Sequence, residues 1–83
     1  MEIKILGKGC PLCNRLEMIT RLALEEANVE AKIEKVTDLN KIMEYDVFST
    51  PGLVIDGKVM CAGKIPAVNT IKEWIVEANE SAR

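Results

Sequence analysis

The chain has 83 residues, of which 48% are hydrophobic and 29% charged, with a formal net charge of −2 and no histidine. This length allows one domain over residues 1–83 with a modest core. The absence of a basic stripe argues against nucleic-acid binding. The first residues are too few and too charged for a signal peptide, and no apolar run reaches the roughly 20 residues of a membrane span. We therefore expect a cytoplasmic monomer with neither a membrane nor a nucleic-acid partner.

The chain should begin with a short strand and a long helix. Residues 2–6 alternate in hydrophobicity, and Gly7-Lys8-Gly9 then breaks the pattern. Pro11 suits the first position of a helix. Apolar residues three or four apart predict that this helix runs over 11–27. The apolar stripe of this helix is expected to comprise Leu12, Leu16, Ile19, Ala23 and Ala27, widened by Met18 and Leu22.

A second strand and a short helix should follow. Residues 29–36 alternate with a period of two, which predicts a half-buried strand at or near a sheet edge. Asp38 is a good N-cap for a helix over about 38–45. The apolar side of that short helix would be formed by Leu39, Ile42 and Met43.

The last part of the chain predicts a hairpin and a final helix. Asp56-Gly57 favours a two-residue type I′ turn, and a regular register from that turn pairs Gly52 with Cys61. Residues 67–79 carry the helical pattern again. The inner face of this helix should comprise Val68, Ile71, Trp74, Ile75 and Ala78. The order β-α-β-α-β-β-α predicts an α/β fold with a mixed four-stranded sheet flanked by helices, whose first two strands are parallel through a right-handed crossover.

The Cys10-Pro11-Leu12-Cys13 sequence lies between the first strand and the first helix. Cysteine is present three times, an odd number that argues against a disulfide scaffold. Helix positions three residues apart are surface neighbours, so these two thiols can form a disulfide after a small local adjustment. Cys10 at the helix N-terminus should have a lowered pKa, because the helix dipole and unsatisfied N–H groups favour its thiolate. The alternative is a pair of buried structural cysteines.

Cys10-Pro11-Leu12-Cys13 after a first strand, Ser49-Thr50-Pro51 before a third, and the order of elements together resemble the thioredoxin fold, and in particular the small thioredoxins or redox-active disulfide proteins. The resemblance implies a thiol–disulfide oxidoreductase or electron carrier that reduces protein disulfides. Cys10 would be the exposed nucleophile and Cys13 the buried resolving thiol. The partners would be disulfide-containing target proteins and a flavin-dependent thioredoxin reductase. No cofactor or metal would be bound, and the Cys10–Cys13 pair would form the redox-active disulfide.

The same resemblance assigns substrate contacts to Thr50, Pro51, Pro11 and Leu12. The Thr50–Pro51 bond would be cis and would face the disulfide, leaving the Thr50 backbone to pair with an extended substrate. The alternative is a trans proline at the start of a strand. Proline after the first cysteine is the arrangement of glutaredoxins. However, Cys61 to Lys64 stand where glutaredoxins carry a Gly-Gly-x-Asp stretch that holds glutathione, so we do not expect dependence on glutathione.

Two further residues are auxiliary candidates. Lys8 precedes Cys10 by two positions and would stabilise a thiolate or meet an acidic partner, unless it is simply a solvated loop residue. Cys61, next to Pro51 in the regular hairpin register, would be an additional thiol within reach of the pair. The alternative is that Cys61 is a small buried core residue.

Two other functions remain open from the sequence. A CxxC sequence between a first strand and a first helix also occurs in modules that bind Cu(I) or Zn, because thiolates are soft ligands. Pro11, the Lys8 position, the Thr50-Pro51 turn and the final helix are untypical of such modules. A non-catalytic redox sensor or interaction domain is the other alternative.

Overall fold

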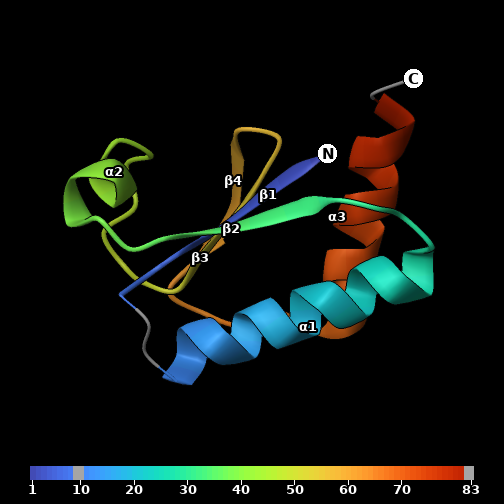
Figure 1. The fold of residues 1–83 in the computed structure, drawn as a ribbon, viewed down its shortest axis with the longest axis horizontal. Coiled ribbons are helices and arrows are strands. Elements are labelled where there is room, and N and C mark those ends of the chain that lie inside the picture. Colours follow the sequence, from blue (N-terminus) through green and yellow to red (C-terminus); the bar gives the residue numbers. More distant parts are fainter. Residues whose placement is uncertain (9–10, 82–83) are drawn as a thin grey trace.

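The computed structural model of the chain describes residues 1–8 and 11–81. The predicted order of elements is confirmed (Figure 1). The elements are β1 (Glu2–Leu6), α1 (Pro11–Ala27), β2 (Lys32–Val36), α2 (Leu39–Met43), β3 (Gly52–Ile55), β4 (Lys58–Ala62) and α3 (Val68–Ser81).

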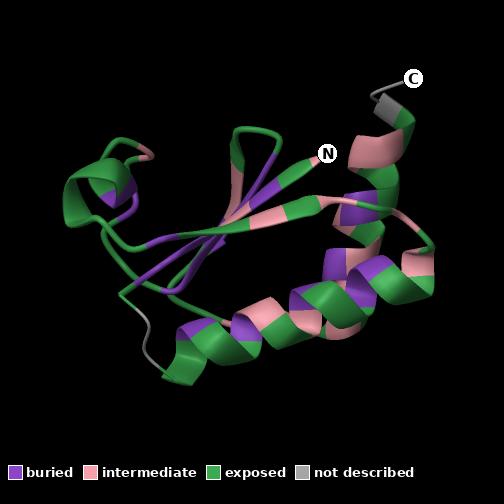
Figure 2. Ribbon diagram, in the orientation of Figure 1, coloured by how far each residue is buried: buried purple, intermediate pink, exposed green. Residues whose placement is uncertain are grey.

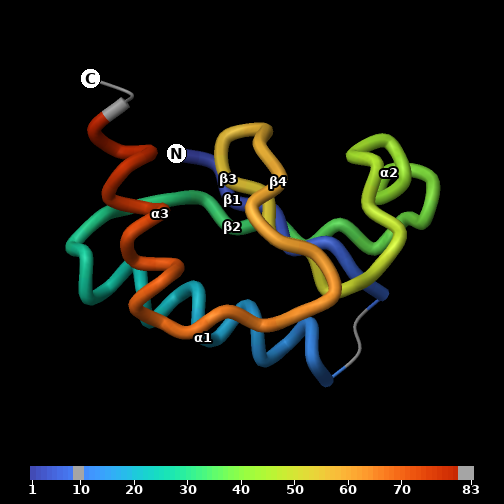
Figure 3. The backbone as a smooth tube through the Cα atoms, turned by 180° about the vertical axis from the view of Figure 1, so that it is seen from behind, coloured from blue at the N-terminus to red at the C-terminus, as the bar shows by residue number. Residues whose placement is uncertain are grey.

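The four strands form one mixed sheet in the order β2-β1-β3-β4. β1 runs parallel to β2 and antiparallel to β3, and β3 is antiparallel to β4. The predicted edge position of the second strand is therefore confirmed. β1 lies inside the sheet although it comes before the other strands in the chain, as the tube in Figure 3 shows.

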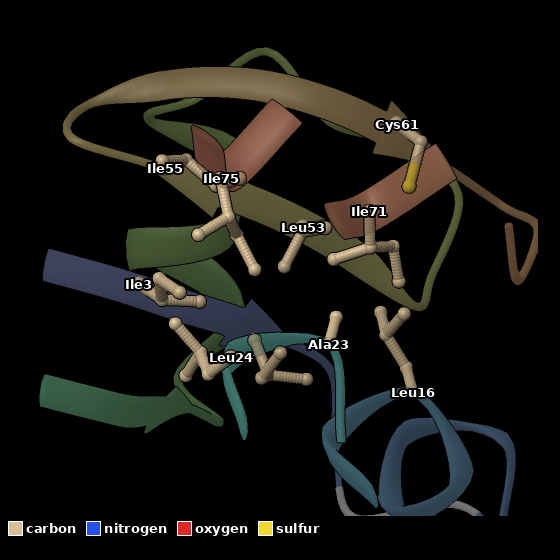
Figure 4. Packing of buried hydrophobic residues seen from close by; sticks show 10 residues of the cluster. Ile3, Leu16, Ala23, Leu24, Leu53, Ile55, Cys61, Ile71 and Ile75 are labelled. Atoms are coloured by element: carbon tan, nitrogen blue, oxygen red, sulfur yellow. The ribbon is translucent and has the colours of Figure 1, made fainter. Parts of the chain in front are cut away.

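Helices cover the two faces of the sheet unequally. α1 and α3 pack together on one face, whereas α2 lies on the other (Figure 1). The larger cluster of buried residues, which we call the main core, lies between the sheet and the α1/α3 pair (Figure 4). The main core consists of Ile3, Ile5, Leu16, Ala23, Leu24, Leu53, Ile55, Cys61, Ile71 and Ile75. The smaller cluster, under α2, consists of Leu6, Val36, Ile42, Val47 and Val54.

The limits of α1 are those predicted, but its buried stripe is rotated. Leu12, Met18 and Leu22 are 52%, 66% and 45% exposed, so their assignment to the inner side was wrong. The buried residues of α1 are Cys13, Leu16, Thr20, Ala23 and Leu24. Thr20 is tolerated at an inward position because its hydroxyl donates to the Leu16 carbonyl at 2.7 Å, so the buried hydroxyl has a hydrogen-bond partner.

β2 and α2 are shorter than predicted. β2 starts at Lys32 because its partner β1 starts at Glu2, opposite that residue, so residues 29–31 have no strand beside them. In α2 only Ile42 is buried, and Leu39 and Met43 are 51% and 47% exposed, which corrects the predicted apolar side. Positions 39, 42 and 43 share one face of a helix, but only Ile42 reaches the smaller cluster, whose other members come from the strands and from Val47.

The hairpin turn is as predicted, but the register beyond it is not. Asp56 and Gly57 have φ values of 48° and 83°, as a type I′ turn requires. The regular register predicted that Cys61 pairs with Gly52. A β-bulge shifts the pairing by one residue, so Cys61 lies opposite Leu53 and Ala62 opposite Gly52. Met60 is the extra residue, and both Met60 and Cys61 pack against the main core.

The last helix extends to Ser81, two residues beyond the predicted limit. Ile71 and Ile75 are fully buried, and Val68, Trp74 and Ala78 pack against them as expected. Within residues 1–8 and 11–81, no helix is both long enough and apolar enough to cross a membrane.

Candidate functional site

The candidate site lies at the end of the sheet where β1 ends and β3 begins. Leu6, the last residue of β1, pairs with Gly52, the first residue of β3. Gly7 follows Leu6 and Pro51 precedes Gly52, so Gly7 lies beside the Thr50–Pro51 turn. Cys10, the predicted nucleophile, lies outside the described residues.

Cys13 lies in the first turn of α1, and its side chain is directed at the end of β1. The residue is only 3% exposed. A Cβ built on Gly7 would overlap the Cys13 Sγ and would lie 3.8 Å from the Thr50 Cβ. Three segments therefore meet at Gly7: the end of β1, the first turn of α1 and, from much later in the chain, the turn before β3.

Thr50 and Pro51 present different groups at this point. The peptide bond between them is cis. Pro51 is buried, and its carbonyl accepts a hydrogen bond from the Gly63 amide at 2.8 Å. Thr50 is exposed, and none of the backbone hydrogen bonds among the described residues outside regular elements uses its N–H or C=O.

A groove lies between α2 and the Thr50–Pro51 turn. It has a volume of about 270 Å³ and a mainly apolar lining. The lining residues are Lys8, Leu39, Ile42, Met43, Val47, Phe48 and Thr50. Phe48 is 82% exposed. No binding role was predicted from the sequence for Leu39, Met43 or Phe48. The available signal was the apolar excess of residues 39–48 over what one short helix can bury.

The other predicted substrate contacts are on the surface. Pro11 and Leu12 are exposed at the start of α1, and Leu12 is 52% exposed. Lys8 is also exposed and is the charged residue in the lining of the groove. An apolar groove with one ammonium group suits an apolar side chain next to a carboxylate.

Cys61 lies in the main core. It is 7% exposed, and its thiol lies 3.9 Å from the Lys64 carbonyl, to which it donates. Figure 4 shows its sulfur pointing into the cluster on the side of Ile71. Burial raises the pKa of the Cys61 thiol, because it disfavours the thiolate more than the Leu53 backbone hydrogen bond favours it. Of the two roles predicted for Cys61, these features support that of a small buried core residue over that of an additional reactive thiol.

An ion-pair network fixes the start of α1 to the edge of the sheet. Lys35 on β2 contacts Glu17 at 2.7 Å and donates to the Asn14 side chain at 3.1 Å. Arg21 also pairs with Glu17, at 2.9 Å. The hydrogen bonds from Lys35 and then Arg21 lower the pKa of the Glu17 carboxyl. Asn14 neighbours Cys13, so the network holds the turn that carries this thiol.

The acidic and sulfur-containing side chains offer no assembled metal site in the part of the chain that is described. There, no three His, Cys, Asp or Glu side chains come together as ligands for one ion.

Comparison with known proteins places the chain in a family. A family model described as a thioredoxin domain matches residues 1–76. A protein named thioredoxin from Methanocaldococcus jannaschii is 48% identical over 71 residues, which cover 86% of this chain and 81% of the relative. One of the same name from Methanothermobacter thermautotrophicus is 34% identical over 73 residues, covering 88% of this chain and 95% of the relative. The chain therefore belongs to the thioredoxin domain family.

Proposed function

We propose that this protein is a thiol–disulfide oxidoreductase that reduces disulfides in target proteins through Cys10 and Cys13. The observation that carries the proposal is the position of Cys13: a buried thiol in the first turn of α1, next to Gly7 and Thr50, in a chain of the thioredoxin family. The two relatives are both named thioredoxin, which supports the same reaction class.

The reaction has two exchange steps. The Cys10 thiolate attacks one sulfur of the target disulfide, and the other target sulfur leaves as a thiolate. Cys13, as its thiolate, then attacks the Cys10 sulfur of the mixed disulfide and releases the second target thiolate. Two electrons have moved to the target, and the protein is left with a Cys10–Cys13 disulfide. No bound cofactor takes part in these steps. A flavin-dependent thioredoxin reductase is the proposed source of electrons for the return to the dithiol.

The target would bind as an extended segment across the end of the sheet. The free N–H and C=O of Thr50 would pair with its backbone as in strand addition. The exposed Pro11 and Leu12 would provide apolar contacts to the target, whereas the buried Pro51 would hold the Thr50 backbone in place for it. The groove under Phe48 would take an apolar target side chain, with Lys8 beside an acidic neighbour. We propose that the protein acts as a monomer in the cytoplasm, where a CxxC pair is more often catalytic than structural.

The test is the reduction of a protein disulfide, with insulin as substrate and a chemical dithiol as the electron source. Cys10→Ser should abolish the reduction, because no nucleophile remains. Cys13→Ser, reduced beforehand and mixed with insulin after removal of the dithiol, should stay trapped as a mixed disulfide with its target, visible by mass spectrometry. Cys61→Ala is the matched control and should retain the rate. Equal rates for the wild type and Cys10→Ser would reject the proposal.

A further inference from the structure

The backbone conformation at Gly7 is one that residues with side chains also adopt. The φ values of Gly57 and Gly63 are +83° and +76°, in the left-handed region that favours this residue. The φ of Gly7 lies outside that region. A residue with a side chain would therefore fit the backbone at position 7, and the reason for glycine lies in its surroundings.

The surroundings of Gly7 are dominated by one atom. The overlap noted above is between a Cβ at this position and the Cys13 Sγ, whereas the Cys13 Cβ would be 3.4 Å away and the Thr50 Cβ 3.8 Å away. The latter two separations are ordinary or only slightly tight contacts. The missing Cβ therefore leaves room for the Cys13 sulfur itself.

Neither backbone can easily move to relieve such an overlap. The Gly7 amide donates to the Val36 carbonyl at 3.0 Å, which continues the β1–β2 ladder. Leu6, just before it, is paired with both Val36 and Gly52. Cys13 is held by α1, where Leu16 is fully buried. An added methyl group would therefore displace the sulfur to another χ1 rotamer, of which a helix readily allows few.

We propose that Gly7 is a positioning residue for Cys13: its lack of a side chain seats the resolving sulfur at the end of β1. This inference rests on the proposed function. In the second exchange step, the Cys13 thiolate forms a bond to the Cys10 sulfur while the target thiolate leaves, and the attacking sulfur must lie in line with the breaking bond. Gly7 is buried, so a target would not reach it, and its effect should fall on this second step and not on the first attack.

The two steps can be observed separately with dithiobis(nitrobenzoate), an aryl disulfide that releases the coloured thionitrobenzoate anion. Its first release reports attack by Cys10, and its second reports resolution by Cys13. Cys61→Ala is the common background, so that only two thiols react. In Gly7→Ala, the first release should keep its rate, whereas the second should slow by about ten- to a hundredfold, because a misplacement on the order of 1 Å has effects of this size.

Gly57→Ala is the matched control. It introduces the same methyl group at a left-handed turn, where a Cβ meets nothing within 4 Å. It should leave both releases unchanged although the turn is strained. An unchanged second release in Gly7→Ala, or an equal slowing of both releases, would overturn the proposal. A wild-type protein that shows no second release, or releases that persist in Cys10→Ser, would instead reject the proposed function itself.

A stability measurement covers the case in which Gly7→Ala folds poorly. The thermal midpoint of Gly7→Ala should fall in the presence of Cys13 and should fall clearly less in a Cys13→Ala background, because the overlapping sulfur is then absent. Equal losses in both backgrounds, or failure to fold in both, would show that Gly7 serves the backbone alone and would overturn the proposal.

Discussion

The two faces of the sheet differ in how completely helices cover them. On one face, α1 and α3, with 17 and 14 residues, bury side chains over several turns and enclose the main core. On the other face, the five residues of α2 bury only Ile42 and leave Leu39 and Met43 exposed, and these two line the groove together with Phe48. Most of the α2 ribbon is coloured as exposed in Figure 2. One face of the sheet is therefore closed by two long helices, whereas the other leaves apolar side chains exposed to solvent.

The largest expected effect is on the free energy of unfolding, and it tests the face of the sheet that α1 and α3 cover. Ile71→Ala removes a fully buried side chain of α3 from the main core. We expect a loss of about 2–5 kcal/mol in the free energy of unfolding, because the truncation leaves a cavity among packed neighbours. Denaturant unfolding measures this loss.

Val76→Ala is the control for Ile71→Ala. Val76 lies on the same helix and is 37% exposed, so its truncation should change the free energy of unfolding by less than about 0.5 kcal/mol. Similar losses in the free energy of unfolding for the two variants would mean that the packing of Ile71 in the main core does not stabilise the fold.

The second prediction tests the face under α2. Phe48→Ala should leave the stability within about 0.5 kcal/mol, because the side chain is 82% exposed. It should raise the KM for a protein disulfide by about tenfold with little change in kcat, as the loss of a buried aromatic contact with the target predicts. Steady-state reduction kinetics measure both parameters.

Leu22→Ala is the control for Phe48→Ala. Leu22 is also a large exposed apolar residue, but it lies on α1 and outside the groove. Its truncation should leave KM unchanged. If both variants raised KM alike, binding would depend on general surface hydrophobicity and not on the groove.

The third prediction concerns the thiol in the main core. Cys61→Ala should lower the free energy of unfolding by about 1 kcal/mol, as expected for a small truncation at a packed site. Because burial raises the pKa of this thiol, Cys61 in the folded wild type should react slowly with iodoacetamide and rapidly once unfolded. Peptide mass spectrometry locates the modification. Fast alkylation of Cys61 in the folded protein would assign it to the reactive surface instead of the core.

The smallest expected effect concerns the link between α1 and the edge strand. The folded pKa of Glu17 is lowered below its ordinary value of 4.5, so its ion pairs stabilise the fold above that pH. This contribution is lost as the pH falls through the folded pKa, and it should be no more than about 1 kcal/mol for a surface network. Glu17→Gln should therefore lower the thermal midpoint at neutral pH and have little effect in acid.

Glu26→Gln serves as the control for Glu17→Gln, since Glu26 is exposed on the same helix. Its midpoint should follow that of the wild type over the same pH range. A difference between Glu17→Gln and wild type that grew towards acid would contradict the direction of the pKa shift.

The features set by local sequence were predicted well. Pro11 and Asn28 mark the ends of α1, and the φ of 56° at Asn28 is that of a left-handed helix stop. The Asp56-Gly57 turn was recognised from its residue types alone. The thioredoxin fold followed from the order of elements together with the two short sequences around Cys13 and Pro51.

The errors arose where a tertiary partner decides the outcome. The bulge at Met60 depends on which side chains fit the main core, and the turn residues carry no information about it. The buried stripe of α1 includes Thr20, which a pattern of apolar residues omits because its hydroxyl is satisfied only once the helix forms. The groove became visible only when α2 proved too short to bury its own apolar residues.

The interior position of β1 has a consequence for synthesis on the ribosome. β1 emerges before the other strands, and β2 can pair with one of its edges as soon as α1 has formed the crossover. The other edge of β1 must wait for β3, about fifty residues later in the chain. During that interval Ile3 and Ile5 lie in a strand with an unpaired edge, which is the form in which nascent chains are most prone to associate.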